Sequence, residues 1–247
     1  MNDPTRPARP KTRTPPGPRA LRAAADDPWD DERPARVTRT PRAARGTAAA
    51  PPAPLTPAQK RERRAAEHAP HEIRIIGGQW RRRLLPVPDM PGLRPTPDRV
   101  RETLFNWLGQ DLAGWSVLDA FAGTGALGFE AASRGATTVQ MLERETRLVS
   151  GLAATKAKLD AAAVTITQAD ALAWMKRAPA QFDLVLLDPP FGADLFEPAL
   201  LAAVRLLVPE GLVYLEADRA VEAAPGLVPW RSGRAGAVHY GLFQRQG

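Results

Sequence analysis

The chain has 247 residues, of which 44% are hydrophobic, and it contains no cysteine. That length can bury a full core in one large domain or two small ones, and the lack of cysteine excludes disulfides, thiolate zinc sites and cysteine nucleophiles. No apolar run approaches the roughly 20 residues that cross a bilayer, and no charged-then-apolar leader opens the chain, so we expect a cytoplasmic protein that does not associate with membranes.

The net charge of +7 is concentrated at the N-terminus. Residues 1–70 hold 15 Lys and Arg against 8 Asp and Glu, whereas the rest of the chain balances at 19 of each. These first residues are rich in Pro, Ala, Arg and Thr, so they cannot bury enough apolar surface to offset the entropy of ordering. We therefore predict a disordered basic arm, which would serve either as a solubilising tail or as an electrostatic tether to nucleic acid.

A small hairpin is expected at the start of the ordered part, which we place at residues 71–247. The apolar pattern predicts a strand over residues 73–76, a tight turn at Gly77-Gly78 and a second strand over residues 80–87. Three consecutive arginines lie on that second strand, where alternate side chains point to opposite faces: Arg81, Arg82 and Arg83.

A helix follows the hairpin and completes an extension over residues 72–114. Thr96 is the expected N-cap, Pro97 the first helical residue and Asp98 an acid in the first turn. One face of this helix is assigned to the core through four apolar residues: Val100, Leu104, Trp107 and Leu108. Residues 74–101 also carry seven arginines against two aspartates, which suggests a phosphate-contacting patch. Its members are Arg74, Arg81, Arg82, Arg83, Arg94, Arg99 and Arg101.

From residue 115 to the end, strands and helices alternate. The expected strands are 117–119, 137–142, 163–168, 182–187 and 212–216, with a final pair near 227–231 and 238–244. The expected helices are 126–134, 146–159, 171–177 and one that ends at residue 207. Repeated β-then-α units predict an α/β fold, with a Rossmann-like parallel sheet that has helices on both faces. Ligands of such sheets bind beyond the carboxyl ends of the strands.

A glycine-rich loop follows the first strand of this alternating region. Gly123 and Gly125 flank Thr124, so the backbone can turn tightly and approach a ligand closely. With Gly128 they satisfy the G-x-G-x-x-G spacing of a dinucleotide site, so the loop alone does not identify its ligand. Asp119 precedes the turn and favours a ligand that brings a cation, such as the ammonium of S-adenosylmethionine, over a pyrophosphate.

Acidic residues occur where successive strands end, at Asp119, Glu143, Asp170 and Asp188. Glu143 lies twenty residues after Gly123, the distance at which an acid binds ribose hydroxyls in nucleotide-binding folds. Asp170, followed by Ala171, would accept a hydrogen bond from an adenine amino group. The alternative for Asp170 and Glu143 is that either one only caps a helix.

The stretch Asp188-Pro189-Pro190-Phe191 is the second strong indication of a functional site. Two successive prolines fix an extended turn, so nearby carbonyls face a partner rather than each other. A carboxylate and rigid carbonyls beside an aromatic ring form a cradle for a planar group with an exocyclic NH2. Hydrogen bonds from that amine would point its lone pair at an electrophile while the ring stacks on the base.

Together, residues 119–125 and 188–191 resemble the class I amino methyltransferases that use S-adenosylmethionine. Residues 74–78, 93–108 and 187–191 look more closely like the RsmD family, whose members methylate the N2 amine of one guanine in bacterial small-subunit ribosomal RNA. The resemblance covers about residues 72–246 and implies a class I methyltransferase fold. It assigns catalysis to Asp188, Pro189, Pro190 and Phe191. It assigns S-adenosylmethionine binding to Asp119, Phe121, Ala122, Gly123, Gly125, Glu143, Asp170 and Ala171.

The resemblance further implies in-line methyl transfer without a covalent intermediate or a metal, on ribosomal RNA or a small-subunit particle, by a protein that we expect to be a monomer. Asp188 is expected to accept the released proton at a pKa near its ordinary value. The candidates for RNA contact are Arg81, Arg82, Arg83, Arg94 and Arg99. The alternatives are a DNA adenine-N6 methyltransferase, a nicotinamide-dependent oxidoreductase and a non-catalytic RNA-binding protein.

Overall fold

A computed structural model describes residues 71–90, 93, 95–179, 181–191 and 194–246. The predicted N-terminal arm, residues 1–70, and Arg94 lie outside the described residues. Within the described ranges, no helix is long and apolar enough to cross a membrane.

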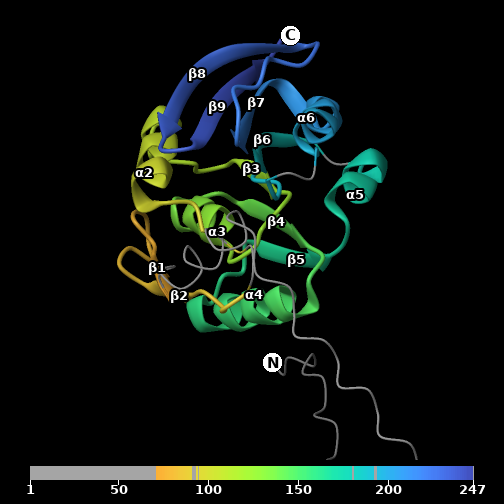
Figure 1. Ribbon diagram of the computed structural model, residues 1–247. Coiled ribbons are helices and arrows are strands. Elements are labelled where there is room, and N and C mark those ends of the chain that lie inside the picture. Colours follow the sequence, from red (N-terminus) through yellow and green to blue (C-terminus); the bar gives the residue numbers. More distant parts are fainter. Residues whose placement is uncertain (1–70, 91–92, 94, 180, 192–193, 247) are drawn as a thin grey trace, which may run out of the picture. The chain divides into compact units, whose positions relative to one another are not determined.

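A mixed sheet forms the centre of the described part of the chain, with seven strands in the order β5-β4-β3-β6-β7-β9-β8 (Figure 1). β9 pairs antiparallel with both β7 and β8, and the other neighbouring strands of this sheet pair parallel. The strands are β3 (Ser116–Asp119), β4 (Thr138–Glu143), β5 (Val164–Gln168), β6 (Phe182–Leu187), β7 (Leu207–Ala217), β8 (Leu227–Ala235) and β9 (Val238–Arg245). This arrangement confirms the predicted Rossmann-like α/β fold.

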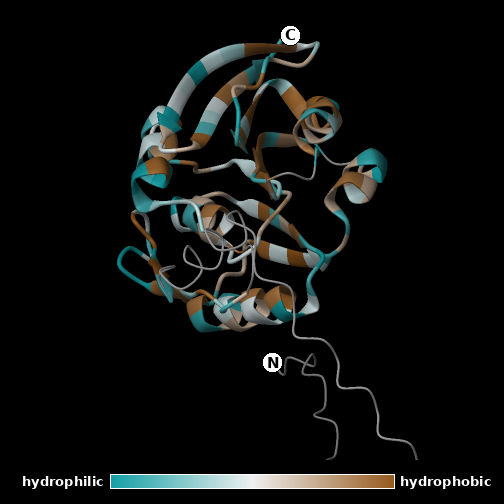
Figure 2. Cartoon of the chain, viewed as in Figure 1, coloured by the Kyte–Doolittle hydropathy of each residue, from teal (hydrophilic) through white to brown (hydrophobic). Residues whose placement is uncertain are grey.

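Helices cover both faces of this sheet. They are α2 (Asp98–Trp107), α3 (Ala126–Ser133), α4 (Thr146–Leu159), α5 (Ala171–Arg177) and α6 (Phe196–Val204). Successive residues of a strand point to opposite faces, so Val117 packs with α2, α3 and α4 while Leu118 packs with α5 and α6. Figure 2 shows apolar residues along the central strands and on the inner sides of these helices.

The strand order reverses between β3 and β6. The chain goes from β3 outward through β4 to β5, then returns across the sheet to β6 on the other side of β3. Loops that follow β3 and β6 therefore diverge and leave a crevice, which is where open α/β sheets bind ligands. Asp119 ends β3 and Asp188 directly follows β6, so both acids lie at this crevice.

The hairpin at the start of the described chain differs from the prediction. Strands β1 (Glu72–Arg74) and β2 (Leu84–Pro86) pair antiparallel, but residues 75–83 form a long polar loop in place of a tight turn. Gly78 is needed for another reason: a Cβ there would lie 1.8 Å from the carbonyl oxygen of Ser133, at the end of α3. The glycine pair thus allows the loop to pack against a helix.

The start of α2 also differs from the prediction. Pro97 occupies the N-cap position without a side-chain hydrogen bond, and the helix begins at Asp98. Thr96 is buried instead, and its hydroxyl donates a hydrogen bond to Asp188 at 3.4 Å. The expected core face of the helix is confirmed, since Val100, Leu104 and Leu108 are buried and Trp107 packs against the same core.

A buried ionic cluster joins the hairpin to α2 and α3. Glu130 on α3 accepts hydrogen bonds from the side chains of Arg101 at 3.2 Å and Arg134 at 2.8 Å. Its two oxygens also accept the backbone N–H groups of Ile76 and Gly77, each at 2.8 Å. Arg101 has no exposed surface, so its predicted place in a phosphate-contacting patch is wrong.

Further differences occur at the edges of the C-terminal elements. Helix α6 ends at Val204 rather than at residue 207, and β7 begins at Leu207 rather than at residue 212. Strand β8 continues to Ala235, beyond the expected end at residue 231. None of these shifts moves a residue away from the carboxyl ends of β3 to β6, where the predicted site lies.

Candidate active site

A cavity of about 510 Å³ opens at the carboxyl ends of β3, β4, β5 and β6. Its walls are the loops after these four strands together with Met90, Leu93, Pro95 and Thr96 of the segment before α2. The volume falls within the roughly 300–1,000 Å³ typical of small-molecule sites. All four acids predicted at the strand ends line this one cavity: Asp119, Glu143, Asp170 and Asp188.

The glycine loop after β3 forms the floor of the cavity. Phe121, Ala122 and Gly123 line it, and Gly123 adopts a φ of 53° that favours glycine. Gly125 does not line the cavity. It precedes α3 with a φ of 80°, and a Cβ there would lie 2.6 Å from the ring of Phe129. Gly125 therefore shapes the turn from inside the core, and contact with a ligand stays a prediction.

Asp119 is only 2% exposed, and its Oδ2 accepts the backbone N–H of Gly128 at 3.0 Å. Burial, against the opposing effect of the Gly128 N–H and with smaller contributions from the acids Asp188 and Glu143, raises the pKa of Asp119 from 3.8 to about 7. Among the described residues, no arginine, lysine or histidine forms an ion pair with this acid. A cationic ligand group would supply the missing charge.

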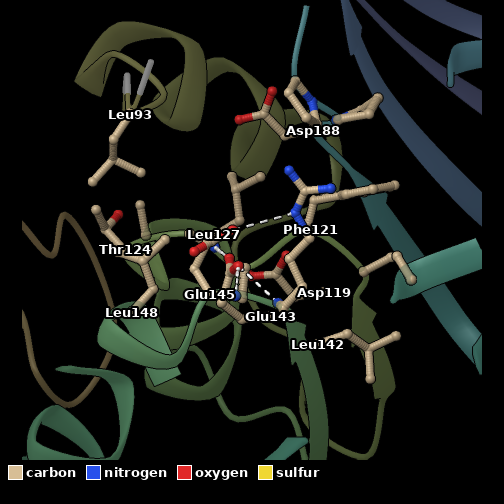
Figure 3. A pocket seen from close by; sticks show the side chains of 18 of the residues that line it. Leu93, Asp119, Phe121, Thr124, Leu127, Leu142, Glu143, Glu145, Leu148 and Asp188 are labelled. Carbon is tan, nitrogen blue, oxygen red and sulfur yellow. Dashed lines mark hydrogen bonds and ion pairs between the residues drawn. The ribbon is translucent and has the colours of Figure 1, made fainter. Parts of the chain in front are cut away.

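Glu143 is held firmly to the glycine loop. Its Oε2 accepts the backbone N–H of Gly123 at 2.9 Å, and its Oε1 accepts those of Arg144 at 2.8 Å and Glu145 at 2.9 Å. Figure 3 shows Glu143 and Asp119 close together, with Asp188 facing the cavity from another side. The end of β4 and the turn after β3 are thereby fixed relative to each other.

Asp170 caps helix α5, which was one of the two sequence-based interpretations. Its Oδ1 accepts the backbone N–H of Ala173 at 2.8 Å. Asp170 and Ala171 both line the cavity. Capping engages one carboxylate oxygen, so the second remains available for a ligand.

The stretch from Asp188 to Phe191 lines the cavity along its whole length. Burial raises the pKa of Asp188 from 3.8 to about 7, and the Thr96 hydroxyl works against this shift. The expected pKa near the ordinary value is therefore wrong, because the sequence did not reveal that the folded protein partly desolvates this acid. The Phe191 ring is 41% exposed and lies 6.2 Å from the ring of Phe196, which leaves a face open to a planar group.

Comparison with known proteins identifies the family. The family model described as Conserved hypothetical protein 95 matches residues 73–244. The chain belongs to this family, the RsmD family.

Curated relatives agree with this assignment. Ribosomal RNA small subunit methyltransferase D of Escherichia coli strain K12 is 43% identical over 182 residues, which cover 71% of this chain and 91% of the relative. The Haemophilus influenzae protein of the same name is 41% identical over 191 residues, with 72% of this chain and 96% of the relative covered.

A solved structure shows the same fold. The Escherichia coli protein yhhF, which is named as a methyltransferase, has a TM-score of 0.66 and 37% identity to this chain. The match covers 71% of this chain and 98% of yhhF. The RsmD-family chain described here thus has the class I methyltransferase fold.

The described arginines among those predicted to contact RNA do not line the cavity. Arg81, Arg82 and Arg83 belong to the exposed loop between β1 and β2, which Figure 2 shows as hydrophilic, and Arg82 has a φ of 70°. The prediction that they alternate between the two faces of a strand is therefore wrong. Arg99 is exposed on α2. The structure leaves these side chains accessible to an RNA phosphate, and that contact stays a prediction.

Sequence reasoning missed three residues next to Asp188. Thr96 was interpreted as a helix cap, and Tyr214 and Glu216 were passed over within an apolar strand. The hydroxyl of Tyr214 donates a hydrogen bond to Glu216 Oε1 at 3.0 Å. An acid embedded in the apolar run of β7 was the available signal, because a buried charge without a partner is costly.

Proposed function

We propose that this RsmD-family protein transfers a methyl group from S-adenosylmethionine to the N2 amine of a guanine in 16S ribosomal RNA. One observation carries the proposal. The Asp-Pro-Pro-Phe stretch after β6 faces the same cavity as the acids that end β3 and β4 and precede α5. A donor and an acceptor amine could therefore meet across the point where the strand order reverses.

The residues of the cavity fit S-adenosylmethionine. Asp119, which has no ion-pair partner among the described residues, would take the ammonium of the methionine part. Glu143, fixed by three backbone N–H groups, would accept the ribose hydroxyls. Asp170 would accept the adenine amino group, with Phe121 and Ala122 along the floor. When bound, this cosubstrate supplies a methyl group that is already activated.

The protein has to orient the acceptor amine. Asp188 would accept an N–H of the guanine amine, so that its lone pair points at the methyl group, and Phe191 would stack on the base. The rigid Pro189-Pro190 backbone keeps these two groups in place. Asp188, with a pKa of about 7, is well matched to receive the proton that the nitrogen loses as the methyl group arrives.

The RNA would be held by charge outside the cavity. Arg81, Arg82, Arg83 and Arg99 offer exposed cations for phosphates, and Arg94 is a further candidate outside the described residues. The target base must leave its stack to reach Asp188, at a cost of a few kcal/mol. We further propose that the protein acts as a monomer in the cytoplasm, on ribosomal RNA or on a small-subunit particle.

A labelling experiment tests the proposal. The purified protein is incubated with S-adenosylmethionine carrying a radiolabelled methyl group and with small-subunit particles, naked ribosomal RNA or duplex DNA. We expect label in the ribosomal RNA of at least one of the first two samples, as N2-methylguanine after nuclease digestion. Label in duplex DNA alone would overturn the RNA assignment. Calorimetric titration with NAD is the control for the cofactor, and NAD binding without S-adenosylmethionine binding would overturn the reaction class.

A further inference from the structure

Glu216 lies beside Asp188 but behind the wall of the cavity. Leu187 of β6 pairs with Leu215 of β7, so the next residues on these parallel strands, Asp188 and Glu216, are neighbours at the same sheet edge. Glu216 is only 3% exposed, whereas Asp188 is half-buried and lines the cavity. An acid in this position influences the reaction only through Asp188.

A single hydroxyl connects the two acids. Thr96 Oγ donates to Asp188 Oδ2 at 3.4 Å, and the same hydroxyl is a neighbour of the Glu216 carboxyl, whose pKa it lowers against the effect of burial. A threonine hydroxyl has one proton, so while it donates to Asp188 it can only accept from Glu216. Glu216 Oε1 already accepts from the Tyr214 hydroxyl at 3.0 Å. While Thr96 donates to Asp188, a hydrogen bond between Thr96 and Glu216 needs a proton on Glu216.

The charges around Glu216 lead to the same conclusion. Among the described residues Glu216 has no ion-pair partner. The nearby cation on α2, Arg101, directs its N–H groups at other acceptors: the carbonyls of Thr96 and Arg74 and the carboxylates of Asp98 and Glu130. The remaining titratable groups that face Glu216 are Asp188 from β6, Tyr214 from its own strand and Tyr240 from β9, which packs on Tyr214. Burial, followed by the charge of Asp188, raises the pKa of Glu216 well above its ordinary value.

We propose that Glu216 is a positioning residue for methyl transfer, which stays protonated and donates to Thr96 Oγ, so that the Thr96 proton points at Asp188 Oδ2. Asp188 is then the ionised member of the pair, and its other oxygen is free to accept the guanine amine. As the N–CH3 bond forms and the S–CH3 bond breaks, the amine proton passes to Asp188 and then to water, while Glu216 keeps its own proton. This inference rests on the proposed function.

The pH dependence of a single turnover tests the proposal. Glutamine at position 216 can accept from Tyr214 and donate to Thr96, as a protonated glutamate does, but it cannot ionise. The rate of the unmodified protein on small-subunit particles should fall at the alkaline pH where Glu216 loses its proton. Glu216→Gln should stay within about tenfold of that protein at neutral pH and should lack the alkaline fall. Glu216→Leu should lose about 10- to 100-fold, the usual cost of removing a group that orients a reacting residue.

Cofactor binding and an exposed acid provide the controls. All variants should bind S-adenosylmethionine within a few-fold of the unmodified protein, and Glu222→Gln, at an exposed acid after β7, should keep the alkaline fall. Two results would overturn the proposal. One is a Glu216→Gln rate as low as that of Glu216→Leu at neutral pH, which would mean that an ionised Glu216 is required. The other is an alkaline fall that persists in Glu216→Gln.

A spectroscopic measurement separates this proposal from the proposed function. In protein labelled with 13C at glutamate carboxyls, the Glu216 resonance is assigned by its absence from Glu216→Gln. We expect it at the position of a protonated carboxyl at pH 7. An ionised Glu216 at that pH overturns the inference, whatever the substrate is. A protonated Glu216 in a protein that methylates no ribosomal RNA overturns the proposed function and the role in methyl transfer, and leaves the protonation state established.

Discussion

Two buried acids in this chain have opposite surroundings. Glu130 has no exposed surface, and its carboxylate is neutralised by Arg101 and Arg134 and accepts two further backbone N–H groups. Glu216 is almost as deeply buried, yet no ion pair compensates it in the described part of the chain. The first arrangement joins the hairpin to two helices, whereas the second lies beside the predicted acceptor of a proton.

Two acids of the cavity resemble Glu216 rather than Glu130 in this respect. Burial raises the pKa of both Asp119 and Asp188 to about 7, and among the described residues neither acid has an ion-pair partner. An acid whose counter-charge is part of the fold stabilises the structure. An acid without a counter-charge is a candidate for ligand binding or for catalysis, because its preferred protonation state changes when a cation binds or a proton arrives.

The largest expected effect concerns the compensated acid. Glu130→Ala leaves Arg101 and Arg134 buried without their carboxylate, and it removes the acceptor of the Ile76 and Gly77 N–H groups. We expect a loss of about 3–5 kcal/mol in the free energy of unfolding, as for other buried ion pairs that lose one partner. Urea denaturation measures it, with Glu222→Ala as an exposed control. A loss below about 0.5 kcal/mol would contradict a structural role for this cluster.

Asp188→Ala should act on the rate instead of on the fold. We expect single-turnover methylation to fall by about two orders of magnitude or more, the scale of losing one preorganised polar contact at a reacting centre. The affinity for S-adenosylmethionine should stay within a few-fold, since Asp119 and Glu143 are unchanged. Asp218→Ala, at an exposed acid just after β7, is the matched control. Near-normal methylation by Asp188→Ala would show that the loop with Pro189 and Pro190 has a structural role only.

Two glycines test whether the loop between β1 and β2 needs its close contact with α3. Gly114 and Gly78 have φ values of 85° and 73°, but a Cβ on Gly114 would meet nothing within 4 Å. We expect Gly114→Ala to cost about 1 kcal/mol from its left-handed backbone alone. Gly78→Ala should cost about 1–3 kcal/mol more, because the added methyl group forces the loop away from Ser133. Equal losses in urea denaturation would show that the loop does not need this close contact.

The smallest effect concerns the stability of the ligand-free protein. The pKa of Asp119 is about 7 in the folded state and near 3.8 when the chain unfolds, so the folded protein holds a proton that the unfolded chain releases. Its contribution to the free energy of unfolding therefore falls as pH rises from about 4 to about 7. Asp119→Asn should reduce that fall by on the order of 1 kcal/mol, measured as Tm at pH 5 and pH 8. An identical fall in both proteins would show that Asp119 titrates normally.

The alternating core could be predicted from sequence because its signals are local. Apolar runs of strand length, helical periodicity and the turn at Gly123 mark each unit, and parallel pairing then gathers the acids at one edge. Asp119, Glu143, Asp170 and Asp188 were placed correctly for this reason. To predict the position of the site from the sequence, one needs only the rule that ligands bind where parallel strands end.

The residues that were misread depend on contacts distant in sequence. Gly78 resembles a hairpin turn until α3 is packed against it, and Arg101 resembles a surface cation until Glu130, 29 residues later, neutralises it. Thr96 is a plausible helix cap, but its hydroxyl reaches Asp188, which is 92 residues away along the chain. Propensity and spacing carry no information about such partners. The pKa values of Asp119 and Asp188 were missed for the same reason, since burial is a property of the folded chain.

We propose that the cavity acids lack a counter-charge until the cosubstrate provides one. Proton release on binding tests this most directly, by titrating S-adenosylmethionine into the protein calorimetrically at pH 7 in buffers of different ionisation enthalpy. Because Asp119 has a pKa of about 7, roughly half of it is protonated at that pH, and a bound ammonium favours its ionised form. We predict a release of up to about half a proton per molecule bound, reduced in Asp119→Asn. Binding with no proton release, or with an unchanged release in Asp119→Asn, would contradict the account.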